Sequence, residues 1–191
     1  MGEEEIARGE IVIASAGMLF YRRRLGEIEV LTAIRQNEPW AGCTTVDFGG
    51  LVKPSDRNVA WAAIREGGEE TGGKLQFHGL RLVGDYGPQN FWHKLKRQGQ
   101  DLIAIPTETP ISGKYHFVHL IYAAEVFAGE PAENPEMLYF RWAKPLDLAD
   151  EGCMFAFEGA LVLAEFWHKI RNHPSWGRDP EVASWIVTPR D

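Results

Sequence analysis

Three glutamates stand at a spacing that suits metal chemistry. Glu66, Glu69 and Glu70 occupy positions i, i+3 and i+4 of a segment that stops at Gly72, so on a helix their carboxylates share one face. Like charges at this spacing repel one another, and acids near a helix C-terminus oppose the helix dipole. A bound cation would reverse both effects. Because carboxylate oxygens suit Mg²⁺ or Mn²⁺, which also bind phosphate oxygens, the pattern predicts a metal site for phosphoryl chemistry.

The same spacing has a second interpretation. A solvated acidic helix end shows the same pattern, and the spacing alone does not decide between the two. Zinc fits poorly, because this helix carries no His or Cys at ligand spacing.

The elements that must position the acids can be predicted from periodicity and punctuation. A helix over residues 58–71 would begin at Asn58 as N-cap and stop at Gly72. Residues 11–21 and 28–34 predict a β-hairpin, and residues 44–48 predict a short strand that Gly49-Gly50 would end. Residues 80–83, 116–127 and 137–142 predict further strands, and residues 154–171 predict a second helix. This order indicates an α/β (α+β) fold with a mixed sheet between helices.

The composition favours one soluble domain over residues 1–191. The chain has 191 residues, of which 45% are hydrophobic, with a formal net charge of −7. Its negative charge argues against a nucleic-acid scaffold, and its acidic N-terminus and short apolar runs argue against a membrane protein. Because it has only two cysteines, it has no disulfide framework and we expect a cytoplasmic location.

Three segments are expected to lie outside the regular elements. Residues 1–9 are expected to form a flexible tail, and residues 172–191 a C-terminal extension. Residues 84–113 lack clear periodicity and predict a long insertion, either a mobile loop or a substrate lid. The insertion carries basic side chains that could contact phosphates, although a solvated loop face is the safer interpretation. These basic residues are Lys94, Lys96 and Arg97.

The segment from Gly49 to Gly72 carries more than the three acids. It opens with Gly49-Gly50, continues with Ala62-Ala63, and ends with Arg65-Glu66-x-x-Glu69-Glu70-x-Gly72. This arrangement resembles the Nudix box, the loop-helix signature of Nudix hydrolases. The preceding Arg35 and Trp40 agree with the usual approach to that box.

The segment departs from the family pattern at several positions. One residue is inserted in the loop, so the glutamate expected there is either replaced by Asp56 or absent. Glycines stand at two positions that are usually hydrophobic, Gly67 and Gly73. Gly67 and its neighbour Gly68 lie inside the predicted helix, where each costs about 1 kcal/mol relative to alanine.

The resemblance implies a Nudix-like α/β/α sandwich and a metal-dependent hydrolase. Such an enzyme uses Mg²⁺ or Mn²⁺ to cleave the diphosphate linkage of a nucleoside diphosphate joined to another group, as in a nucleotide-sugar, ADP-ribose or a dinucleotide. The three glutamates would be metal ligands, and Arg65 would orient a glutamate. We expect Arg35 and the Gly49-Gly50 pair to help bind the substrate.

Several roles remain open in the sequence. Glu136, in an acid-rich loop before a strand, is the candidate general base, although an exposed loop acid is the more common explanation. Trp40 or Trp92 could stack a base. Pro88 lies sixteen residues past Gly72, where a proline accompanies ADP-ribose hydrolysis in some Nudix members, although residues 84–88 fit a turn equally well. The partner would be a small nucleotide-like molecule, and a homodimer is possible. The alternative function is a Nudix-fold binding or regulatory module without turnover, which the inserted residue and Gly67-Gly68 make plausible.

Overall fold

A seven-stranded mixed sheet forms the centre of the molecule. The computed structural model describes residues 13–38, 40–87, 91–110, 117–173 and 176. The strand order is β3-β2-β1-β8-β5, with β4 also paired to β1 and β9 to β2; only the β1–β8 pairing is parallel among these. The strands are β1 (Ile13–Arg24), β2 (Glu27–Arg35), β3 (Thr44–Thr45), β4 (Phe48–Leu51), β5 (Gln76–Tyr86), β8 (Phe117–Ala128) and β9 (Met137–Ala143).

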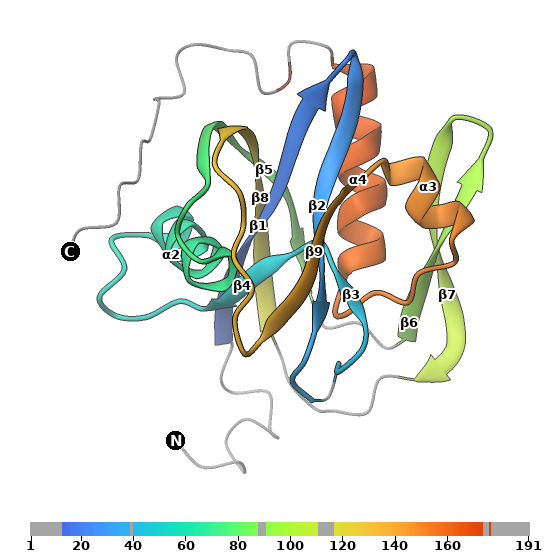
Figure 1. The fold of residues 1–191 in the computed structure, drawn as a ribbon. Coiled ribbons are helices and arrows are strands. Elements are labelled where there is room, and N and C mark those ends of the chain that lie inside the picture. Colours follow the sequence, from blue (N-terminus) through green and yellow to red (C-terminus); the bar gives the residue numbers. More distant parts are fainter. Residues whose placement is uncertain (1–12, 39, 88–90, 111–116, 174–175, 177–191) are drawn as a thin grey trace.

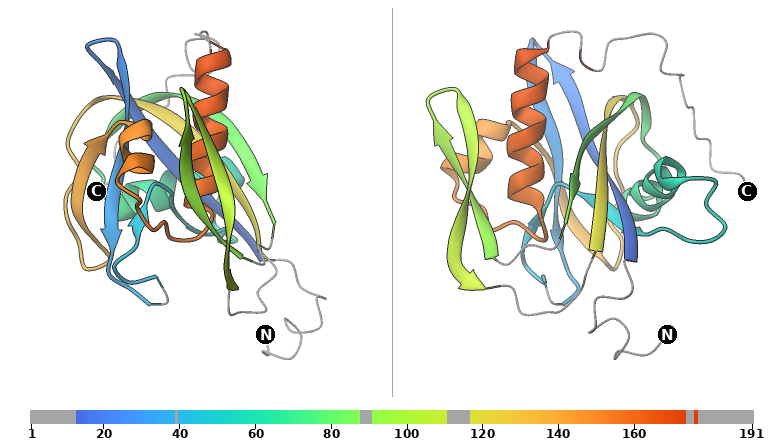
Figure 2. Two further views of the ribbon diagram at one scale, coloured as in Figure 1. Left: turned by 90° about the vertical axis from the view of Figure 1, so that its right-hand side faces the viewer. Right: turned by 180° about the vertical axis from the view of Figure 1, so that it is seen from behind.

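Helices cover both faces of this sheet. Helix α2 (Val59–Thr71) lies on one side, and helix α4 (Gly159–Asn172) lies on the other (Figure 1). A separate hairpin of β6 (Phe91–Gln98) and β7 (Asp101–Pro110) packs outside α4 together with the short helix α3 (Pro145–Asp150) (Figure 2). The predicted mixed sheet between helices is confirmed. None of the described helices is long and apolar enough to cross a membrane.

Alternating side chains of β1 feed two hydrophobic cores. Met18 and Phe20 are fully buried on the side of α2, whereas Leu19 and Tyr21 are fully buried on the side of α4. This alternation is the period of two expected for a strand with both faces covered. The central position of β1 therefore fixes α2 against the sheet, and with it the glutamates on that helix.

The ends of α2 are set by the residues predicted to set them. Asn58 is the N-cap, and its side chain accepts a hydrogen bond from the backbone N–H of Trp61 at 3.0 Å. Gly72 is left-handed, with φ of 77°, and the Gly73 N–H donates to the Gly68 carbonyl at 2.7 Å. Glycine is favoured at this position, because it adopts the left-handed conformation that closes the last turn of a helix.

The two glycines inside α2 have different surroundings. A Cβ on Gly67 would lie 2.8 Å from Cγ of Met18 and 3.0 Å from Cζ of Phe20. Gly67 therefore lets the helix approach β1 closely. A Cβ on Gly68 would meet nothing within 4 Å, so close packing does not explain this second glycine.

These surroundings predict opposite effects for the same substitution. Gly68→Ala should raise the free energy of unfolding by about 0.5–1 kcal/mol, because alanine restricts the unfolded chain and favours the helix. Gly67→Ala should lower it by about 1–3 kcal/mol, because the added methyl group overpacks the core. Urea denaturation of the metal-free proteins measures both changes. Shifts of the same sign in the two variants would contradict this account of the helix.

The sequence-based prediction for Gly49-Gly50 is wrong. The pair does not end a strand but lies inside β4, where Gly49 pairs with Gly17 and Gly50 with Ala16 of β1. A Cβ on Gly49 would lie 2.6 Å from both the Ala16 carbonyl oxygen and the Gly17 Cα. Because glycine has no side chain, the two strands can pair this closely. Treating glycine only as a strand breaker does not predict such a pairing.

The prediction of a long insertion without regular structure over residues 84–113 is also wrong for the described part. Strand β5 continues to Tyr86, and β6 and β7 form an antiparallel hairpin. Leu95 and Leu102 anchor this hairpin in the core on the α4 side of the sheet. Residues 88–90, which include Pro88, and residues 111–116 lie outside the described residues.

The C-terminal elements also differ from the sequence predictions. The last helix begins at Gly159 rather than near residue 154, because the preceding segment pairs with β3: Thr44 donates to the Met154 carbonyl at 2.8 Å, and Ala156 donates to the Thr44 carbonyl at 2.9 Å. Helix α3 was not predicted. The predicted tail over residues 1–9 lies outside the described residues, as does the extension over 172–191 apart from its first two residues and Trp176.

Candidate active site

The C-terminal half of α2 borders an acidic cleft. The cleft has a volume of about 320 Å³. It is lined by the three glutamates of the helix and by part of the loop that precedes β9: Glu66, Glu69, Glu70, Asn134, Pro135 and Glu136. The structure thus brings together the three predicted metal ligands and the predicted general base, four acids that belong to segments about 65 residues apart in the chain.

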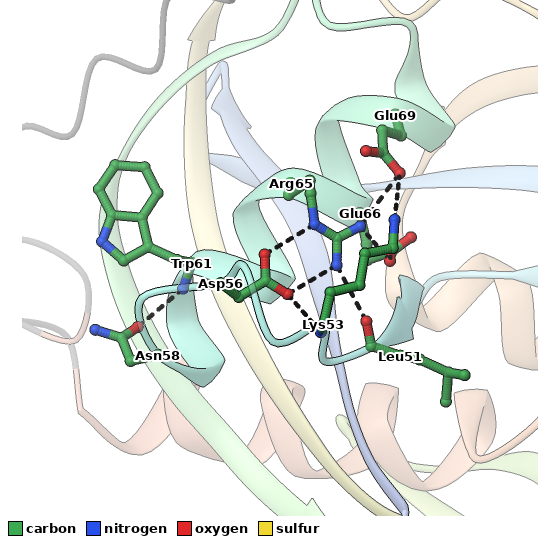
Figure 3. Close-up of polar contacts among 8 residues, drawn as sticks. All are labelled: Leu51, Lys53, Asp56, Asn58, Trp61, Arg65, Glu66 and Glu69. Atoms are coloured by element: carbon green, nitrogen blue, oxygen red, sulfur yellow. Dashed lines mark hydrogen bonds and ion pairs between the residues drawn. The ribbon is translucent and has the colours of Figure 1, made fainter. Parts of the chain in front are cut away.

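Arg65 organises the acidic side of this cleft (Figure 3). Its guanidinium forms a bidentate pair with Asp56, at 2.9 Å to each oxygen, and donates to the Leu51 carbonyl at 3.0 Å. Its third nitrogen donates to Glu66 and, at 3.3 Å, to Glu69. The hydrogen bonds with Asp56 raise the pKa of Arg65 further and lower the pKa of Asp56. A fixed guanidinium therefore orients two of the three glutamates.

Lys53 adds a second positive charge beside the same acids. Its Nζ lies 3.8 Å from Oε1 of Glu66 and 3.8 Å from Oε2 of Glu69. Lys53 and Glu69 are about half exposed, whereas Glu66 is mostly covered. These contacts are consistent with weak, solvent-screened pairs that other cations can replace.

Glu70 is the buried glutamate among the residues that line the cleft. The residue is 7% exposed, and its Oε2 has no hydrogen-bond partner. Among the described residues, Glu70 pairs with Arg35, whose Nη1 lies 3.8 Å from Oε1 of Glu70, beyond normal hydrogen-bond distance. Burial, followed by the charge of Asp47 and with a further contribution from Glu136, raises the pKa of Glu70 to about 9. An additional cation at this carboxylate would stabilise its charged form.

Asn134 holds the loop that carries Glu136 over the end of α2. Its side-chain amide donates to the Glu70 carbonyl at 2.7 Å, and its side-chain oxygen accepts from the N–H groups of Glu136 and Met137 at 2.9 and 3.0 Å. The Glu136 carbonyl also accepts from the Gln36 N–H at 2.8 Å. The backbone of Glu136 is therefore fixed from two sides, which the sequence did not indicate.

The three residues predicted to bind substrate have different places. Arg35, at the end of β2, lies beside Glu70 and therefore next to the cleft. Gly50 faces Glu66, and a Cβ there would lie 2.7 Å from Cδ of that glutamate, so glycine makes room for the carboxylate. Gly49 instead packs on the backbone of β1.

Comparison with known proteins identifies the family. The NUDIX domain matches residues 13–163 of this chain. This chain belongs to the Nudix family. The segment from Gly49 to Gly72 is accordingly its Nudix box, and the inserted residue lies in the loop between β4 and α2. Asp56 of that loop pairs with Arg65.

Solved structures share the fold at low sequence identity. The Ap4A hydrolase of C. elegans, in a binary complex, has a TM-score of 0.55 and 18% identity, covering 84% of this chain and 98% of that chain. The NUDIX domain of Shewanella oneidensis NrtR, complexed with ADP ribose, has a TM-score of 0.59 and 13% identity, covering 89% and 99%. The MutT NUDIX hydrolase of Burkholderia pseudomallei has a TM-score of 0.56 and 19% identity, covering 81% and 98%. No curated protein sequence matches this chain.

Sequence reasoning missed a buried hydrogen-bonded chain on the α4 side of the sheet. Nε2 of His119 lies 2.6 Å from Oδ2 of Asp47, and its Nδ1 lies 2.6 Å from Oγ of Ser15. Although burial alone would lower the pKa of His119, the charge and hydrogen bond of Asp47 and the charge of Glu158 raise it. All three residues are less than 10% exposed. Their hydrogen bonds therefore link β1, β8 and the β3–β4 connection.

The basic residues of the β6–β7 hairpin are not among those that line the acidic cleft. Arg97 pairs with Asp150 of α3 at 2.8 Å. Trp92 packs against Trp40, with ring centroids 3.9 Å apart. The predicted phosphate contacts of Lys94, Lys96 and Arg97 stay a prediction.

Proposed function

We propose that this chain is a Mg²⁺- or Mn²⁺-dependent hydrolase that cleaves the diphosphate linkage of a nucleoside diphosphate joined to another group. The observation that carries the proposal is the acidic cleft, in which Glu70 is buried without a partner for Oε2 while Glu66, Glu69 and Glu136 line the same space. Membership of the Nudix family supports it. In the reaction a P–O–P bond is replaced by a P–O bond to a water oxygen, which yields two phosphate monoesters.

The chemistry of the cleft suits a hard divalent cation. Glu66, Glu69 and Glu70 offer only oxygen donors, as Mg²⁺ and Mn²⁺ prefer. Within the described ranges, no three His, Cys, Asp or Glu side chains already surround one point, because Glu66 and Glu69 turn toward Arg65. Metal binding therefore includes a side-chain rearrangement at these two glutamates. When bound, the metal would polarise a phosphoryl oxygen and activate water.

The protein groups around the cleft then have separate roles. Glu136 is the candidate general base, because the Asn134 contacts hold its backbone beside the metal ligands. Arg35 is the candidate phosphate-binding cation, because its Nη1 lies beside Glu70 at 3.8 Å, too far for a hydrogen bond. Arg65 acts on Glu66 and Glu69 as a positioning residue.

A second candidate function is a binding or regulatory module without turnover. The observations that favour it are the inserted residue in the box loop and the absence of a preassembled cluster among the described acids. The pairing of Asp56 with Arg65 favours the enzyme, because it keeps the arginine next to the glutamates.

A substrate screen distinguishes the two functions. The full-length protein is incubated with ADP-ribose, an ADP-sugar, a dinucleoside diphosphate and Ap4A, in the presence of Mg²⁺, Mn²⁺ or a chelator, and phosphatase-coupled release of phosphate is measured. The enzyme predicts release from at least one compound only when metal is present. Tight binding of a nucleotide without cleavage of any compound would support the binding module instead.

Metal binding should also be visible as a gain in stability. Mg²⁺ or Mn²⁺ at one hundred times its dissociation constant should stabilise the folded state by about 2.7 kcal/mol, because only that state holds the site. Glu69→Gln should remove most of the resulting rise in melting temperature. Glu130→Gln, which changes an exposed acid outside the cleft, is the control. An equal rise in wild type and Glu69→Gln would place the metal elsewhere.

A further inference from the structure

Three aromatic side chains meet next to Arg35, the cation that lies beside Glu70. We call Trp40, Trp92 and Phe157 the aromatic cluster; they come from the loop after β2, from β6 and from the segment before α4. The ring centroids of Trp40 and Trp92 are 3.9 Å apart, and those of Trp40 and Phe157 are 5.1 Å apart. Trp40 is 7% exposed and packs with Cys43 and Ala156, so it forms the fixed base of the cluster.

Arg35 links this cluster to the cleft. Its guanidinium carbon lies 5.0 Å from the centroid of the Phe157 ring, and its Nη1 lies 3.8 Å from Oε1 of Glu70. The same cation therefore contacts the aromatic cluster on one side and the buried glutamate on the other. A ligand with an anionic group at Arg35 would have an aromatic surface directly adjacent to that group.

The Phe157 side chain is exposed rather than buried. The residue is 41% exposed although it contacts both Arg35 and Trp40. Its φ of +47° is a left-handed value that non-glycine residues rarely adopt. The flanking backbone is fixed by hydrogen bonds, from the Ala156 N–H to the Thr44 carbonyl at 2.9 Å and from the Gly159 N–H to the Ala156 carbonyl at 3.0 Å. These bonds hold the backbone so that the Phe157 ring stays beside Arg35.

We propose that Phe157, supported by Trp40 and Trp92, is the platform on which the nucleobase of the substrate stacks, with the diphosphate at Arg35 and the cleft. The inference rests on the proposed function for the identity of the reaction, and it adds that the substrate is recognised through an aromatic base. A planar base gains contact with an exposed ring, and the guanidinium next to that ring favours the phosphate attached to the same ligand.

The alternative explanation is that the three rings only pack the segment before α4. That explanation accounts for Trp40, which is buried, but gives no role to the exposed Phe157 ring beside the same guanidinium that lies next to Glu70. It also predicts no difference between ligands with and without a base.

Binding measurements test the proposal without requiring turnover. Dissociation constants for ADP, ribose 5-phosphate and inorganic pyrophosphate are measured by calorimetry on the full-length protein in Mg²⁺. The wild type should bind ADP at least about tenfold more tightly than the two ligands without a base, because stacking of one base commonly contributes this much or more. Phe157→Leu should weaken ADP binding about tenfold, leave pyrophosphate binding within about twofold, and be rescued by Phe157→Tyr.

Phe127→Leu is the matched control, because Phe127 is also exposed but lines a different pocket near Arg22 and Arg23. It should change none of the three constants. If Phe157→Leu fails to fold, the wild-type comparison of ADP with the base-free ligands still decides. Equal affinity of the wild type for ADP and pyrophosphate, or equal weakening of both by Phe157→Leu, would overturn the proposal. Tight ADP binding without hydrolysis of any compound would overturn the proposed function and leave the base platform standing.

Discussion

Glu70→Gln is expected to lower turnover of the best substrate by at least about a hundredfold. The substitution removes a charge from the metal-binding face, and the metal contributes several kcal/mol to the transition state, of which about 2.7 kcal/mol corresponds to two decades in rate. Steady-state kinetics in saturating Mg²⁺ or Mn²⁺ measure the change. Glu130→Gln, an exposed acid outside the cleft, should retain wild-type turnover.

The stability of the metal-free protein separates this effect from damage to the fold. The pKa of Glu70 is raised from 4.5 to about 9, so between these values the folded state holds a proton that the unfolded state releases. This group therefore makes the folded state less stable as the pH rises from about 4.5 to 9. Because glutamine resembles the protonated acid, Glu70→Gln should be folded at neutral pH and should lack this part of the pH dependence. Lost activity together with unfolding would contradict the assigned role.

Arg65→Ala is expected to cost about 10- to 100-fold in activity, the usual effect of removing a group that orients metal ligands. The guanidinium is held by Asp56 and Leu51 and donates to Glu66 and Glu69. Without it, two carboxylates lose their orientation. The readout is the rate as a function of Mg²⁺ concentration.

This readout distinguishes positioning from a general loss of stability. The concentration of Mg²⁺ that gives half of the maximal rate should rise in Arg65→Ala, so that part of the activity returns at high metal concentration. Arg57→Ala is the matched control, because Arg57 lies over the Trp61 ring, 5.4 Å from its centroid, and is absent from the residues that line the cleft. A similar loss in both variants would contradict the positioning role.

The sequence predicted the helix of the box and the shared face of its acids because both depend on local signals. Asn58 and Gly72 mark the ends of α2, and the i, i+3 and i+4 spacing places the three glutamates along one cleft. The helix and the shared face of its acids can therefore be predicted without knowledge of contacts between distant residues. The sequence offered Glu136 only as one acid in an acid-rich loop, because only the fold brings that loop to the cleft.

The features that were missed depend on contacts between distant residues. Asp47 and His119 are 72 positions apart, and Ser15 and His119 are 104 positions apart, so no periodicity reveals their hydrogen bonds. Gly49-Gly50 was misread because their strand is specified by the close approach of β1 rather than by their own preference. The β6–β7 hairpin lacks a clean alternation because most of its side chains are exposed and few anchor it.

The most direct test of the central claim is hydrolysis of the best substrate in ¹⁸O-labelled water, followed by mass spectrometry, with Mg²⁺ present and after its removal by a chelator. Cleavage of the diphosphate linkage by water predicts two phosphate monoesters, one of which carries a single ¹⁸O atom, and predicts no products after chelation. Products that form equally without metal, or no cleavage of any tested diphosphate with Mg²⁺ or Mn²⁺, would contradict the account.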